Sequence, residues 1–153
     1  MSLSDVGNMA EAIAAVAVVV SLVYLAIQIR QNTKAVRASS YEEVANGVTD
    51  FQSSLAQNDG LTRIYLKGTA DPKQLSPEEL LRFEMVLGQL FIKYDVAVYF
   101  YQQHLVDDMA IEPYTKYILL LLNSPGIMNW WERSQHFFSD HMRNYIEEQR
   151  GAQ

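Results

Sequence analysis

The sequence contains no cysteine and only three histidines, seven glycines and four prolines among its 153 residues. The lack of cysteine excludes disulfide frameworks, thiolate zinc sites and cysteine nucleophiles. It also lacks a glycine-rich phosphate loop and a Gly-x-Ser-x-Gly nucleophile motif. Basic residues number 12 against 18 acidic ones, giving a formal net charge of -6. This acidic balance argues against nucleic acid as a partner, because binding phosphates requires clustered cations.

The residues able to carry chemistry are few and do not converge. Glu132, His136 and Asp140 are spaced by four and would align on one continuous helix, but Ser139 predicts a break in that helix. His104 and Asp107 could place two ligands on one helical face, whereas a metal site needs three or four converging ligands. The sequence therefore predicts no catalytic residue, no metal ligand and no cofactor, and it disfavours an enzyme.

The longest apolar run covers Ala12 to Ile29 and contains no charged residue. As a helix it spans about 27 Å, close to the ~30 Å hydrocarbon core of a bilayer. A cleaved signal peptide would need a basic segment before the run, and the preceding residues are acidic. A buried helix of a soluble protein is the stronger alternative, although the run is apolar on every face. We expect a transmembrane helix over residues 9–29.

Three cations follow this run directly, namely Arg30, Lys34 and Arg37, and none precedes it. The positive-inside rule therefore predicts a short external tail of residues 1–8 and places residues 30–153 in the cytoplasm. The cations are also positioned to face anionic headgroups, so membrane lipid is an expected partner.

Small and polar residues within the run repeat at a helical spacing of 4-3-4-3-4, which puts them on one face. We call this face the seam, and it consists of Ala10, Ala14, Ala17, Ser21, Tyr24 and Gln28. Small residues let helices approach closely in lipid, and serine or glutamine can hydrogen-bond across the contact. The seam predicts helix–helix packing, most simply between copies of the chain.

The remaining sequence predicts an all-α fold in which the membrane helix leads into a cytoplasmic helical bundle. Residues 30–57 form a juxtamembrane amphipathic helix, whose apolar stripe is Tyr41, Val44, Val48, Phe51 and Leu55. Two heptads are too few to distinguish a coiled coil from packing against the rest of the chain. Residues 58–148 form the bundle, and residues 149–153 form a polar tail. Helix starts are expected at Ser76, Pro113, Ser124 and Ser139, and a short helix is expected to stop at Gly68.

The helix after Ser76 is apolar enough to raise the question of a second membrane span. Lys93 and Asp95 lie at its centre, where each would cost roughly 2.5–3.5 kcal/mol in lipid, so we expect a bundle helix instead. Its aromatic stretch over residues 85–101 could line a pocket for a lipid or apolar ligand, or pack as core. Trp130 and Trp131 are adjacent, so one ring is expected in the core and the other against a partner or the membrane interface.

Three segments resemble a widespread group of uncharacterised bacterial proteins with an N-terminal membrane helix and a small helical domain. The segments are VVSLVYLAIQIRQNTKAVRASSYE, LSPEELLRF and SPGIMNWWERSQHFFSDHMRNYI. They occur in the same order and cover nearly the whole chain. The resemblance implies a bacterial inner-membrane location with a single membrane pass, and it implies no activity and no functional residues.

These patterns together favour a non-enzymatic, membrane-anchored interaction or scaffold protein that forms homo-oligomers. One alternative is an accessory subunit of a larger membrane complex, whose seam meets a different protein. A further alternative is a binder of lipid or of a small apolar ligand.

Overall fold

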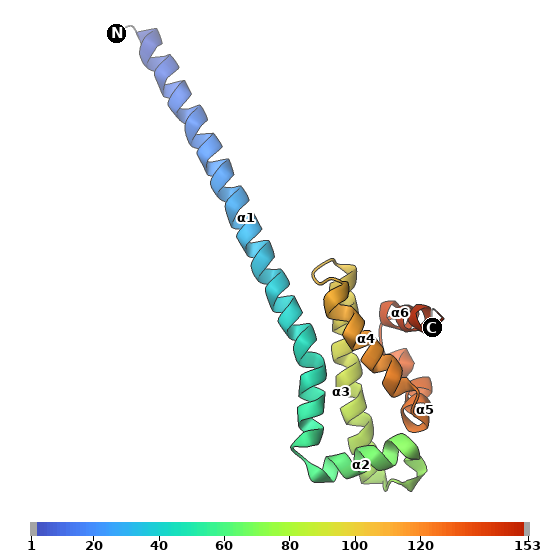
Figure 1. Cartoon of the computed structure of the whole chain (residues 1–153). Coiled ribbons are helices and arrows are strands. Elements are labelled where there is room, and N and C mark those ends of the chain that lie inside the picture. Colours follow the sequence, from blue (N-terminus) through green and yellow to red (C-terminus); the bar gives the residue numbers. More distant parts are fainter. Residues whose placement is uncertain (1–2, 152–153) are drawn as a thin grey trace. The chain divides into compact units, whose positions relative to one another are not determined.

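The computed structural model describes the backbone of residues 3–151 and the side chains of residues 4, 7, 8 and 10–151. Within this part of the chain the fold is all-α, as predicted, and contains no strand. The α-helices are α1 (Leu3–Ala56), α2 (Asp59–Ala70), α3 (Pro77–Gln102), α4 (Asp108–Leu122), α5 (Pro125–Ser134) and α6 (Asp140–Gly151) (Figure 1). Two short 3-10 helices, η1 (Pro72–Gln74) and η2 (Gln135–Phe137), connect them.

The chain divides into two compact units, Met1–Ala38 and Ser39–Gln153. The first unit contains the N-terminal part of α1, and the second contains the end of α1 together with α2 to α6. Residues 3–8, expected as a tail, belong to α1, and α6 continues through residues 149–151, where a polar tail was expected. No helix breaker lies between residue 8 and the apolar run, so the helix extends in both directions from it.

The start of α3 follows the predicted capping chemistry, and α2 begins at a cap that was not predicted from the sequence. Ser76 Oγ accepts from the Glu79 amide at 3.2 Å, and a Glu79 carboxylate oxygen accepts from the Ser76 amide at 2.9 Å, which completes the capping box of α3. These hydrogen bonds hold the pKa of Glu79 below its usual range. The side chain of Asn58 caps α2 by accepting from the Leu61 amide at 3.0 Å. Local sequence therefore fixes where α2 and α3 begin.

α2 does not stop at Gly68 but continues to Ala70. Gly68 is buried inside the helix, where an added Cβ would stand 2.6 Å from the ring of Phe83. A Cβ on Gly126 of α5 would in turn overlap the carbonyl oxygen of Gly68. The two glycines permit close approach of helices, so their role is packing rather than helix termination.

α4 begins at Asp108, five residues before the expected start at Pro113, which lies inside the helix. Proline has no amide proton and cannot donate the helical hydrogen bond to the carbonyl of Met109. The first turn of α4 tolerates this loss because Met109 is 80% exposed at the surface. The proline therefore marks a turn of helix with a weakened hydrogen-bond ladder, not a helix start.

Both tryptophans lie in the core, each 4% exposed. The ring centroids of Trp130 and Trp131 lie 5.0 Å and 5.2 Å from that of Phe91, and Phe138 packs against both indoles. The expectation that one ring reaches a partner or the membrane interface is therefore corrected. The chain folds back through η2 after α5, and Phe138 then covers the side of the pair that a lone helix would expose.

The amphipathic stripe of residues 41–55 packs onto the bundle. Val44 and Phe51 are each 4% exposed, while Tyr41 at the start of the stripe is 53% exposed. Lys93 on α3 forms ion pairs with Asp50 at 2.8 Å and Glu43 at 3.6 Å. The hydrogen bond to Asp50 raises the pKa of Lys93. Of the two possibilities left by the sequence, the structure shows packing against the chain's own helices.

A buried hydrogen-bond chain joins α3 to α4. The hydroxyl of Tyr94 donates to Thr115 Oγ1 at 2.9 Å, and Thr115 donates to the carbonyl of Ile111 at 2.9 Å. The hydroxyl of Tyr114 donates to the carbonyl of Leu90 at 3.1 Å. Burial raises the pKa of both tyrosines, so they stay neutral donors.

α6 is attached to the middle of α3 through one carboxylate. Asp95 accepts from the amide of Ser139 at 2.9 Å and from its hydroxyl at 2.5 Å. The same hydroxyl oxygen accepts from the Met142 amide at 3.2 Å. Ser139 is thus the predicted cap of the last helix, and Asp95 orients it.

Candidate functional site

The apolar segment of α1 has no protein cover of its own. Every side chain from residue 10 to residue 39 is exposed, and the large apolar ones between Ile13 and Ile29 are 49–66% exposed. Among the described residues, α1 is the one helix long and apolar enough to cross a membrane. A stretch of this length, apolar on all sides, is unfavourable in water and requires an apolar environment outside its own unit.

Polar side chains of the seam form two hydrogen bonds within α1. Ser21 Oγ donates to the carbonyl of Ala17 at 2.8 Å, and the amide nitrogen of Gln28 donates to the hydroxyl oxygen of Tyr24 at 2.7 Å. All four residues belong to the seam, and each bond joins residues one helical turn apart on that face of α1. Because these bonds lie within the helix, they lower the cost of placing the bonded groups in an apolar environment.

The three cations after the apolar run lie exposed on the same helix. Arg30, Lys34 and Arg37 line a shallow hollow of about 300 Å³ together with Ile29 and Thr33. Their spacing of four and three keeps them on neighbouring turns of one face. The hollow combines positive charge with apolar side walls, which suits a phosphate group next to hydrocarbon.

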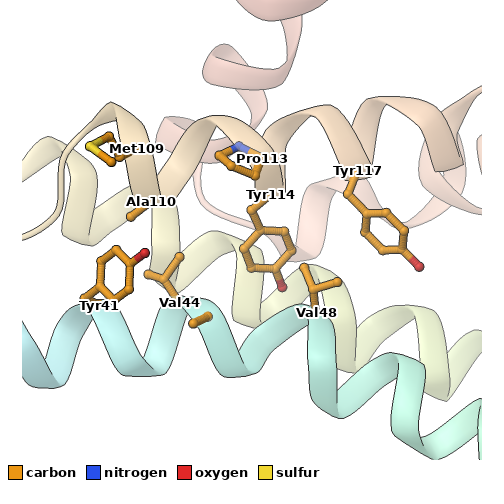
Figure 2. A pocket seen from close by; sticks show the side chains of 9 residues that line it. Tyr41, Val44, Val48, Met109, Ala110, Pro113, Tyr114 and Tyr117 are labelled. Atoms are coloured by element: carbon orange, nitrogen blue, oxygen red, sulfur yellow. The ribbon is translucent and has the colours of Figure 1, made fainter.

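A second candidate site is an apolar groove of about 340 Å³ between the end of α1 and α4. Figure 2 shows Tyr41, Val44 and Val48 on one side and the α4 side chains on the other. Every lining residue is either apolar or a tyrosine: Tyr41, Val44, Ala45, Val48, Met109, Ala110, Pro113, Tyr114 and Tyr117. Such a lining offers van der Waals contact and few polar groups, so it suits a hydrocarbon ligand.

Two residues shape this groove. The ring of Tyr114 points from α4 onto α1 at Gly47, which leaves no room there for a Cβ. Tyr41 and Met109, 53% and 80% exposed, lie on its two walls and can move without disturbing the core. The groove is therefore rigid at its base and adaptable at its entrance, because methionine has several rotatable bonds.

The sequence does not predict this groove; it offers the aromatic stretch over residues 85–101 as either a ligand pocket or core packing. In the structure Tyr94 of that stretch is fully buried and packs 5.0 Å from Tyr114, ring centroid to centroid. The signals that could have located the groove were Gly47 and Pro113, each inside a helix where neither residue is favoured. Glycine in a helix often marks close packing by another element.

The possible catalytic and metal clusters do not form. Glu132 belongs to α5, His136 to η2 and Asp140 to α6, so the break predicted at Ser139 separates them. Within the described part of the chain, no group of three or more acidic or histidine side chains is arranged to hold a metal ion. His104 lies just after the end of α3 with a φ of 55°, the left-handed conformation typical of a residue that follows a helix C-terminus.

Comparisons of the chain with family models, with curated proteins and with solved structures find no match.

Proposed function

We propose that the chain is a membrane-anchored interaction protein without a catalytic role, which acts as a scaffold by self-association through α1. The observation that supports this most is the charge-free run from Ala12 to Ile29, whose side chains are all exposed in a single helix. Lipid would cover the apolar faces, and the seam would meet the seam of a second copy.

The proposed location is the bacterial inner membrane, crossed once, with the N-terminus outside and residues 30–153 in the cytoplasm. The position of Arg30, Lys34 and Arg37 and the resemblance to bacterial single-pass proteins support this orientation. Because the chain has no cysteine, Asn8→Cys and Gln103→Cys each give a single labelling site. A membrane-impermeant thiol reagent applied to intact cells should label the first variant and not the second. The reverse pattern would invert the proposed topology.

Self-association is tested with alanine substitutions that differ only in helix face. Ala14→Leu with Ala17→Leu widens the seam, whereas Ala15→Leu with Ala26→Leu adds the same volume on the opposite face. In detergent, the seam variant should lose the oligomer and the control should keep it. Equal oligomer size in both variants would contradict seam packing. Stoichiometric co-purification of another protein from membranes would favour the accessory-subunit alternative.

Binding of a lipid or small apolar ligand is a second candidate function, supported by the apolar groove between α1 and α4. Extraction of the purified chain and mass analysis of bound small molecules tests it directly. Ala110→Leu should fill the groove and reduce the bound species at least several-fold, because Ala110 lines it. Ala56→Leu adds the same volume at an exposed position of α1 and should leave binding unchanged. Equal recovery from both variants would locate the ligand elsewhere.

A further inference from the structure

The cations of the first unit have no partner within the chain. Arg30, Lys34 and Arg37 form no ion pair and no side-chain hydrogen bond in the part of the chain that the structure describes. No acidic residue occurs over residues 12–41, so no carboxylate of this stretch can pair with them. In the second unit, by contrast, cations such as Lys93 are paired with carboxylates. The first unit therefore carries uncompensated positive charge on an otherwise acidic chain.

These cations line one hollow of about 300 Å³ with two further residues, and we call it the basic hollow. It consists of Ile29, Arg30, Thr33, Lys34 and Arg37. The side chain of Thr33 also forms no hydrogen bond within the described residues, so its hydroxyl is available to donate. Ile29 is 57% exposed and gives the hollow an apolar wall at the end of the uncharged run.

This set of groups matches the headgroup phosphate of an anionic phospholipid. Arginine presents a planar fork of donors that fits phosphate oxygens, and lysine adds a point charge. A free phosphate would leave the apolar wall at Ile29 uncovered, whereas an acyl chain continues from the phosphate along the exposed apolar side chains that precede it.

We propose that the basic hollow binds the headgroup of an anionic phospholipid as a defined site on one face of α1. The proposal rests on the proposed membrane anchoring of α1. It goes beyond the general attraction of cations to a negative surface, because that attraction depends on the number of cations and not on the helix face that carries them.

The basic hollow lies on the side of α1 opposite the seam. Successive residues of a helix are rotated by about 100°, which places the centre of the hollow roughly 180° around the helix from the centre of the seam. When two copies pair through their seams, both hollows then face outward, toward lipid. Each copy therefore binds its own phospholipid, and self-association does not compete with lipid binding.

A variant of identical composition tests whether the shared face is required. Arg30→Asn with Asn32→Arg, combined with Lys34→Gln and Gln31→Lys, spreads the three cations to about 100–140° from one another around the helix. In this scattered variant the net charge and the cations that follow the apolar run are kept in number, so the orientation expected from the positive-inside rule is unchanged. Diffuse attraction to a negative surface is also equal, and only the basic hollow is lost.

The parent chain and the scattered variant are each reconstituted at full length in vesicles of equal parts phosphatidylglycerol and phosphatidylcholine. After extraction in mild detergent, native mass spectrometry identifies the retained lipids. The parent should retain phosphatidylglycerol over phosphatidylcholine by at least about tenfold, and the scattered variant should retain the two nearly equally. Excess inorganic phosphate should not displace the lipid from the parent, because it does not cover the apolar wall.

Three results would overturn the proposal. An equal preference in the two chains would assign it to diffuse attraction, and no preference in the parent would remove the site. Displacement of the lipid by inorganic phosphate would make the basic hollow a site for free phosphate.

Failure of the lipid site is distinguishable from failure of the proposed function. Ala14→Leu with Ala17→Leu changes the seam, so it should abolish the oligomer and keep the preference for phosphatidylglycerol. Loss of the preference in this variant would contradict the placement on opposite faces. A chain recovered in the soluble fraction would remove the anchor and the lipid site together, whereas a membrane-bound chain without lipid preference would remove the lipid site alone.

Discussion

The ring of Tyr114 lies against the backbone of Gly47, so that a Cβ on this glycine would stand 2.7 Å from the tyrosine hydroxyl. α1 and α4 thus meet where one helix has no side chain. Overpacking in Gly47→Ala is expected to cost about 1–3 kcal/mol. Alanine favours a helix over glycine by roughly 1 kcal/mol, so the second unit should lose up to about 2 kcal/mol of stability.

Chemical denaturation in mild detergent, followed by tryptophan fluorescence, measures the effect of Gly47→Ala. Gly151→Ala is the matched control, since no described atom lies within 4 Å of its added Cβ. The control should be neutral or slightly stabilising. Equal stability of the two variants would show that Tyr114 moves aside freely and does not fix the base of the groove.

A larger loss is expected for Gly126→Ala. Its Cβ would overlap the backbone carbonyl of Gly68, and backbone cannot rotate away as a side-chain end can. α2 and α5 would have to separate, so we expect a loss of at least 2–3 kcal/mol or failure to fold. The same denaturation experiment reports it, and a midpoint close to that of the parent chain would contradict the close helix contact.

The buried hydrogen bonds from Tyr94 through Thr115 to Ile111 predict that the two ends of the Tyr94–Thr115 bond differ in the stability lost on substitution. Tyr94→Phe removes one hydrogen bond of about 1 kcal/mol and leaves Thr115 donating to Ile111. Thr115→Val leaves the buried hydroxyl of Tyr94 without its acceptor, which costs about 1–3 kcal/mol. Thr115→Val should therefore be the more destabilising of the two in denaturant titrations. The opposite order would mean that the tyrosine hydroxyl finds another acceptor.

His104 occupies the left-handed position that glycine usually takes after a helix. Its amide bonds to the carbonyl of Tyr101 at 3.0 Å, and the next amide, of Leu105, reaches back to Phe100 at 2.9 Å. Because glycine adopts a positive φ at no steric cost, His104→Gly should raise the free energy of unfolding by about 0.5–1 kcal/mol. His104→Ala, which lacks this freedom, should not stabilise. If His104→Ala raised the free energy of unfolding as much as His104→Gly, the positive φ at this position would not be the cause of the gain.

Stability at alkaline pH should depend on Tyr65. Burial, together with Tyr117, raises the pKa of Tyr65 from 10.0 to about 12. The folded state therefore binds the Tyr65 hydroxyl proton more tightly than the unfolded state. The contribution of the neutral tyrosine to folding stability is complete below pH 10 and is lost as pH rises toward 12. Denaturation midpoints measured across this window should fall, and Tyr65→Phe should make the fall shallower. A fall of the same slope in the variant would assign it to the other buried tyrosines.

Local chemistry explains which parts of the fold are predictable from sequence. The capping box at Ser76 and the cap at Ser139 use residues within three positions of each other, so the pattern alone locates both helix starts. The uncharged run from Ala12 to Ile29 likewise follows from the composition of one helix. These features require no knowledge of what packs against them.

Tertiary contacts explain what was not predictable. From the sequence, Gly68 is expected to end a helix. In the structure the ring of Phe83 packs closely against it, so the glycine serves helix packing. The sequence predicts that one ring of the adjacent tryptophan pair is exposed. In the structure Phe138 packs against Trp131 and covers it. The groove depends on which helices become neighbours, and a single sequence does not determine this. The Lys93 and Asp95 charges, read as evidence against a membrane span, turn out to be contacts to α1 and α6.

The hydrogen bonds between Asp95 and Ser139 determine from which end α6 unfolds locally. The amide of Ser139 and the first turn of the helix are held by Asp95 of α3, while the side-chain hydrogen bond near the far end is the long one from Arg150 to the Met128 sulfur at 4.0 Å. Local opening of α6 should therefore proceed from its far end inward. Amide hydrogen exchange should then be fastest near residue 151 and become slower toward Met142.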